Sequence, residues 1–231
     1  MTTKANEKVQ KLGGFIIKDV EHGILFDESN GMYPSKMFGY TGEPEVFGSK
    51  VSTSYGIIKT GEVLLKIDGA VWGPLKEGQY FSVQGLFELS GNAEVVINER
   101  IGFKGVFTIA GPVEKQGRLS YIDGCSDSLL IYPPRLGDPV FNILWFPKNV
   151  KQTMHIHPSI RFGYVLYGNG RCVTPEGEVP LTEGKVFRLS EMAQHCFNTD
   201  DSEMAIVAYH PDSDWGPTDT NHPMLNRTLI R

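Results

Sequence analysis

Hydrophobic residues occur along this chain in short runs that end at glycine, proline or Asp-Gly. Residues 55–67 form a strand-like run that ends at Asp68-Gly69, a pair typical of a tight hairpin turn. Two further short runs lie at 93–97 and 105–109, and neither keeps a helical spacing of apolar positions. The pattern therefore predicts an all-β protein of antiparallel hairpins with little helix.

The second half of the chain repeats the plan of the first. Residues 75–81 read LKEGQYF and residues 181–187 read LTEGKVF, and each segment follows a strand-like run that begins at Tyr55 or Tyr164. Self-similarity of this kind is typical of a duplicated unit. We therefore expect two β-halves of similar topology.

The length and composition are those of a folded protein, and the charge and hydrophobicity exclude some classes of binding partner. The chain has 231 residues, of which 40% are hydrophobic, and 26 glycines and 14 prolines favour many turns. The net charge is −5 without any block of like charges, which argues against nucleic acid as a partner. No apolar run is long enough to predict a transmembrane helix, so no membrane partner is expected.

The first residues of the chain and its three cysteines indicate the cellular compartment to expect. The first residues are polar and do not resemble a signal peptide. Cys125, Cys172 and Cys196 are odd in number and far apart, which predicts neither a disulfide framework nor a zinc knot. We therefore expect a cytoplasmic protein.

Histidines supply the candidate chemistry. His155 and His157 stand two residues apart, and on a strand two such side chains point to the same face about 7 Å apart. Neutral imidazole is a ligand for Fe, Zn, Ni, Cu and Mn. A third ligand must come from another strand, and His195 follows the repeated hairpin of the second half. The pattern predicts one metal site in the second half.

This arrangement resembles the first of the two motifs of the cupin superfamily, which reads His-x-His, then Glu, then Gly. His155, His157 and Gly168 stand at the expected spacing. The glutamate position of the motif is occupied by Arg161, and an arginine does not bind a metal because it stays protonated.

The second cupin motif, in which Gly is followed by Pro-x-Gly, His and Asn, is matched in part. Gly184 and His195 have the expected spacing, and Asn198 stands one position early. Ser190 and Met192 replace the proline and the second glycine of the motif.

The resemblance implies an all-β fold of two cupin-like antiparallel β-barrels, each a double-stranded β-helix or jelly roll. The first half has no histidine at the equivalent positions, so its barrel is expected to be metal-free. The expected organisation is N-terminal wrapping strands at 1–50, a degenerate barrel at 51–115, a connector at 116–140, a metal-binding barrel at 141–210 and a tail at 211–231.

The resemblance also implies a single divalent metal ion held by His155, His157 and His195. Fe(II) is our first choice, as in the cupin thiol dioxygenases and diketone-cleaving enzymes, which use three histidines; Zn, Ni or Mn are alternatives. Strand alternation places Arg161 and Tyr167 on one face, and we expect Arg161 to act catalytically by orienting a substrate carboxylate. A structural ion pair of Arg161 is the alternative.

These features together favour an enzyme, a mononuclear non-haem iron dioxygenase-type oxidoreductase that acts on a small carboxylate-bearing substrate. A metal-dependent isomerase, epimerase or lyase, and a non-enzymatic cupin that binds a small ligand, both stay open. The expected partner is a small molecule, and the formation of a homodimer is left open.

Overall fold

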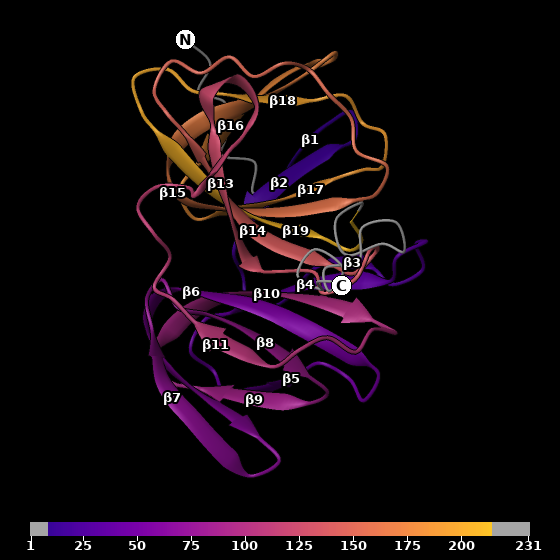
Figure 1. The fold of residues 1–231 in the computed structure, drawn as a ribbon, viewed down its shortest axis with the longest axis vertical. Helices are drawn as coiled ribbons and strands as arrows, with labels where there is room; N and C mark the ends of the chain where they lie inside the picture. The colour runs from indigo at the N-terminus through magenta and orange to yellow at the C-terminus, as the bar shows by residue number, and fades with distance from the viewer. Residues whose placement is uncertain (1–8, 214–231) are drawn as a thin grey trace, which may run out of the picture.

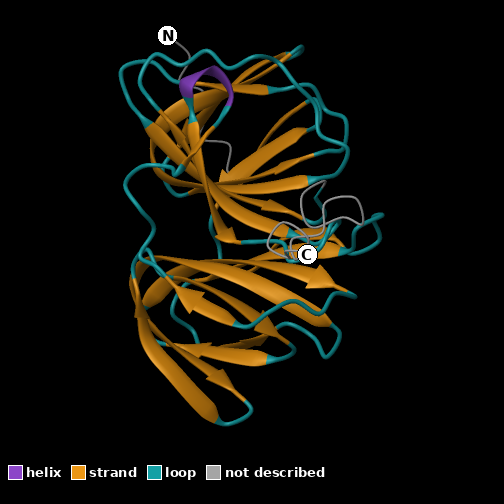
Figure 2. Cartoon of the chain, viewed as in Figure 1, coloured by secondary structure: helices purple, strands orange, loops and turns teal. Residues whose placement is uncertain are grey.

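The computed structural model describes residues 9–213, and these form two curled antiparallel sheets (Figures 1 and 2). The nine-stranded sheet contains β3 (Gly23–Glu28), β4 (Ser35–Tyr40), β5 (Glu45–Phe47), β6 (Ser52–Ile67), β7 (Ala70–Lys76), β8 (Tyr80–Gln84), β9 (Phe87–Ser90), β10 (Ala93–Ile101) and β11 (Thr108–Ala110). The ten-stranded sheet contains β1 (Val9–Leu12), β2 (Phe15–Asp19), β12 (Leu119–Ser120), β13 (Ser126–Ile131), β14 (Val140–Phe146), β15 (Arg161–Thr174), β16 (Gly177–Thr182), β17 (Lys185–Leu189), β18 (Cys196–Asn198) and β19 (Met204–His210).

The described part of the chain has a single helical turn, the 3-10 segment Ile122–Gly124. None of its helical structure is long and apolar enough to span a membrane. The all-β prediction is therefore confirmed.

The two sheets have matching strand orders. The nine-stranded sheet runs β11-β8-β6-β10-β4-β3, and the ten-stranded sheet contains the run β2-β17-β15-β19-β14-β13. In each sheet one long strand, β6 or β15, pairs with the next four strands along the chain. The repeat that the two LxEGxxF segments predict is thus a repeat of strand pairing.

A glycine opposite a phenylalanine occupies the same place in both halves. Gly163 of β15 pairs with Phe187, and a Cβ added to Gly163 would lie 2.0 Å from the ring of Phe187. Gly56 of β6 pairs with Phe81, and there the distance would be 2.2 Å. Each ring lies over the bare backbone, so a side chain at the glycine would displace it.

Replacement of Gly163 by alanine is expected to destabilise the protein by about 2–3 kcal/mol, because a buried ring must leave its place in a packed core. For a chain of this size the melting temperature should fall by roughly 5–10 °C, which thermal unfolding measures. Gly56→Ala should have a similar effect, and Gly31→Ala, in an exposed turn, should have little. An unchanged melting temperature for Gly163→Ala would contradict this packing.

Residues 9–50 divide between the two sheets. Strand β2 pairs with β17, so that β1 and β2, indigo in Figure 1, lie with the C-terminal strands. Strands β3, β4 and β5 belong to the nine-stranded sheet. Residues 1–50 were expected to form wrapping strands; among those that the structure describes, β1 and β3 are edge strands of the two sheets.

The expected connector also contributes strands. Residues 119–131 include β12 and β13, and β13 pairs with β14. The proline-rich stretch 132–139 is a loop, as its breakers predict. The strands of this region are short and their apolar pattern is weak, so their sequence alone did not separate them from a linker.

The core has three layers. One apolar cluster fills the nine-stranded sheet, and a second fills the ten-stranded sheet. A third lies between the sheets and includes Tyr55 and Ile57 from one half with Phe162 and Tyr209 from the other. The two halves are therefore joined by a shared hydrophobic layer, and the apolar cluster inside each sheet is distinct from it.

Candidate metal centre

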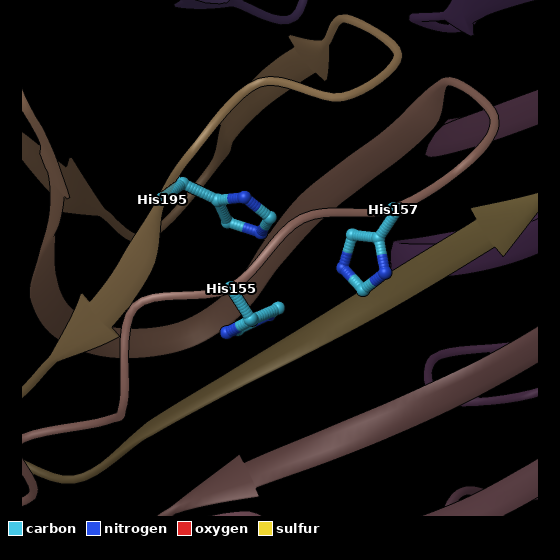
Figure 3. A group of neighbouring side chains, drawn as sticks. All are labelled: His155, His157 and His195. Carbon is cyan, nitrogen blue, oxygen red and sulfur yellow. The ribbon is translucent and has the colours of Figure 1, made fainter.

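The three histidines that the sequence singled out lie together in the interior of the ten-stranded sheet (Figure 3). The candidate ligand atoms of His155, His157 and His195 all lie within 4.8 Å of one another. The ring centroids of His155 and His195 are 4.5 Å apart, and that of His157 lies 5.0 and 5.1 Å from them. One ion could contact all three rings.

The first two histidines lie on a loop and not on the regular strand that their spacing predicts. The loop joins β14 to β15, and its residue His155 makes an isolated antiparallel bridge with His195, which lies between β17 and β18. The backbone N–H of His155 donates to the carbonyl of His195 at 2.9 Å, and that of His195 donates back at 3.0 Å. This antiparallel pair directs the two side chains to the same side.

The backbone also fixes which ring nitrogen can bind a metal. The Nδ1 atom of His155 lies 2.8 Å from the carbonyl oxygen of Thr153, and Nδ1 of His195 lies 3.0 Å from that of Ala193. A carbonyl oxygen only accepts, so both Nδ1 atoms carry the proton and donate. The Nε2 lone pairs are left for a ligand, the arrangement found around protein-bound metals.

Burial keeps the imidazoles of His157 and His195 neutral. Burial, with the nearby charge of Arg161, lowers the pKa of His157 to about 3. Burial likewise lowers the pKa of His195 to about 4, and the side chain of His195 is only 1% exposed. At neutral pH both rings are therefore uncharged, and the donor set fits an ion of the kind that binds imidazole.

The departures from the second cupin motif have structural reasons. Ser190 replaces the proline, and its backbone N–H donates to the carbonyl of Gly14 at 2.9 Å, a bond that a proline could not make. Met192 replaces the glycine and still has a positive φ of 56°. Its N–H donates to the carbonyl of His157 at 2.8 Å, so this turn holds one of the candidate ligands.

Met192→Gly is expected to be tolerated or slightly stabilising, by up to about 1 kcal/mol. A methionine in the left-handed region costs about 1–2 kcal/mol, and the greater freedom of glycine in the unfolded chain offsets part of the gain. The side chain of Met192 is exposed, so little packing is lost. Chemical denaturation would measure the change, and a loss of several kcal/mol would contradict the assigned strain.

Asn198 and Gln152 hold the histidine loop against β18. The Oδ1 atom of Asn198 accepts a hydrogen bond from the N–H of Gln152 at 3.0 Å. The Oε1 atom of Gln152 accepts one from the N–H of Phe197 at 3.1 Å. The asparagine of the second motif thus acts here as a positioning residue for the loop.

Next to the histidines lies a cavity of about 70 Å³, here called the inner cavity. Its wall is largely apolar, with Leu144, Phe187 and Ile206 among the residues that line it. The volume is enough for an ion with a few water-sized ligands.

Arg161 lines the inner cavity with the three histidines, as strand alternation predicts. It shares the inner face of β15 with Val165, whereas Phe162 and Tyr164 pack between the sheets. Its Nη1 atom donates to the carbonyls of Ser159 and Ile160 at 3.1 and 3.0 Å and to the Ser159 hydroxyl. These contacts fix the orientation of the guanidinium.

Tyr167 was expected on the same face as Arg161, and that expectation is wrong. A β-bulge between Val165 and Tyr167 shifts the register with β19, so that Tyr167 packs against the layer between the sheets. One extra residue in a strand reverses the faces of those that follow.

Several cavity residues carry no motif and were missed by the sequence analysis. His210 lines the inner cavity from β19, and its ring centroid is 6.2 Å from that of His157. Burial holds the pKa of His210 well below its usual value. Asn142 of β14 and Tyr121 line the same cavity. Alternation along β19, where Ile206 and Ala208 face inward, could have indicated His210.

Comparison with known proteins supports the fold. No family model and no curated sequence matches the chain. Among solved structures it is similar to a cupin 2 conserved barrel domain protein from Leptotrichia buccalis (14% identity, TM-score 0.58, 90% of this chain and 91% of that one).

Two similar enzymes were also found. One is the oxalate decarboxylase of Bacillus subtilis, described with Mn(II) centres (10% identity, TM-score 0.53, 90% and 76% of the chains). The other is the salicylate 1,2-dioxygenase of Pseudoaminobacter salicylatoxidans, a variant in complex with gentisate (10% identity, TM-score 0.57, 76% and 68%). With the matched strand orders and the histidine group, these likenesses show that the chain has the cupin fold.

Proposed function

We propose that this protein is a metal-dependent enzyme, a mononuclear non-haem iron dioxygenase-type oxidoreductase that acts on a small carboxylate-bearing molecule. The observation that carries the proposal is the group of three imidazoles, two of them with Nε2 left for a ligand, next to a cavity that an arginine also lines. Two cupin-fold neighbours are a dioxygenase and a manganese-containing decarboxylase, which supports metal chemistry in this fold.

His155, His157 and His195 would hold the ion. A bound ferrous ion would supply redox chemistry and open coordination positions for dioxygen and substrate. Arg161 stands where the cupin motif has its carboxylate ligand, and its positive charge beside the cavity favours an anion there. In this proposal Arg161 binds and orients the substrate carboxylate, while the apolar wall keeps water from the reacting groups.

The proposal is tested by elemental analysis of the purified protein, followed by measurements of oxygen uptake with a panel of small carboxylic acids. Iron in the protein together with acid-dependent uptake is the expected result. Zinc, nickel or manganese without uptake would overturn the dioxygenase and favour an isomerase, epimerase or lyase. Protein that retains no metal after incubation with each ion would favour a non-enzymatic binding protein.

A further inference from the structure

A second and larger cavity adjoins the inner one. This outer cavity has a volume of about 370 Å³. Tyr121, Asn142, Arg161 and His210 line both cavities, so these side chains form the boundary between them. The inner cavity is too small for more than a few atoms beside an ion, and the outer cavity can take the remainder of a small molecule.

The wall of the outer cavity contains a pair of buried polar side chains on neighbouring strands. Asp127 of β13 is 8% exposed and Asn142 of β14 is 5% exposed. The Nδ2 group of Asn142 donates a hydrogen bond to Oδ2 of Asp127. Because an ionised carboxylate only accepts, this bond fixes the amide, and its oxygen must point away from Asp127.

That amide oxygen is unsatisfied. Oδ1 of Asn142 is buried and has no hydrogen-bond partner within residues 9–213. A buried acceptor without a donor is unfavourable, so this oxygen would be stabilised by a ligand that brings a donor group. Asn142 lines both cavities, so the unsatisfied atom belongs to a side chain in their common wall.

Asp127 favours a donor that is also positively charged. None of the ion pairs among the described residues includes Asp127. Burial raises the pKa of its carboxyl, which the hydrogen bond from Asn142 only partly opposes. A cationic group in the cavity would stabilise the ionised form of this carboxylate.

The outer cavity is therefore lined by opposite charges, Arg161 from β15 and Asp127 from β13. Asp212, a second acid in the wall, accepts a hydrogen bond from the Ser159 hydroxyl. We propose that the outer cavity binds an ammonium group of the substrate through Asp127 and Asn142, so that the substrate is an amino acid in the broad sense, with its carboxylate toward Arg161. The contact between the substrate carboxylate and Arg161 rests on the proposed function.

The test measures binding, not turnover, by titration calorimetry on the metal-loaded protein. The probes are chain-matched pairs of amino acids and plain acids: glycine and acetate, β-alanine and propionate, 4-aminobutyrate and butyrate, 6-aminohexanoate and hexanoate. In at least one pair the amino acid should bind about tenfold tighter or more. Asp127→Asn should remove that preference while leaving the binding of the plain acid and the metal content unchanged.

Alkylamines of the same chain lengths separate this proposal from the proposed function. If amines bind in an Asp127-dependent way and plain acids do not, the ammonium site stands and the carboxylate role of Arg161 falls. Equal binding of both members of every pair, a preference that survives Asp127→Asn, or no binding of any amine or amino acid would each overturn the ammonium site. Glu178→Gln, a change on the outer surface of β16, is the matched control and should alter nothing.

Discussion

His157→Ala is expected to leave the purified protein almost free of metal. The change removes one of three imidazoles without a carboxylate to replace it, because the motif position for glutamate holds Arg161. Loss of an outer residue that only orients a ligand costs about 10–100-fold in affinity, so the loss of a ligand itself should cost more than 100-fold. Elemental analysis after dialysis against a weak chelator measures the effect.

His22→Ala is the matched control for this experiment. His22 lies in the other half of the molecule, where its Nε2 atom is 2.8 Å from Glu45 Oε2, and it takes no part in the histidine group. This variant should keep the full metal content. Full occupancy in His157→Ala, or equal loss in both variants, would place the metal elsewhere.

Two changes at Arg161 are expected to weaken the binding of carboxylic acids without loss of metal. Arg161→Lys keeps the positive charge but loses the planar fork, so the binding of carboxylic acids should weaken about tenfold or more with unchanged metal content. Arg161→Glu places a carboxylate where the cupin motif has one. We expect this variant to retain metal at least as well as the wild type and to lose the binding of carboxylic acids, because an anion now faces the cavity.

The control for these variants is Arg171→Lys, a change at an arginine that pairs with Glu178 and Asp200 away from the cavity. It should leave both metal content and acid binding as they are. Acid binding that survives in Arg161→Glu would show that Arg161 does not recognise the substrate. Equal loss of metal and acid binding in Arg161→Lys would show that its role is structural.

The candidate metal site was largely predictable because its residues lie in two short motifs. His155 and His157 stand two residues apart, and His195 follows the LxEGxxF segment at the spacing of the family motif. The orientation of Arg161 also follows from a local rule, since side chains alternate between the two faces of a strand. The bulge that reverses Tyr167 has no comparable signal in the residues around it.

The outer cavity could not be predicted in this way. Its opposing charges, Arg161 and Asp127, come from strands β15 and β13, and the partner of Asp127 comes from β14. Taken alone, each of these residues is an ordinary polar residue in a strand. They reach one cavity wall only in the folded sheet, because their distance depends on which strands become neighbours.

The sequence by itself determined the all-β class, the repeat and the histidine group, because turn residues, alternation and motif spacing act over a few residues. The tertiary structure decided where the short strands went: β2 joins β17 at the far end of the chain, and β12 and β13 join the sheet from the expected connector. Short strands have only a weak pattern of apolar and polar residues. Their pairing is therefore decided by which sheet edge has unpaired backbone groups in the folded protein.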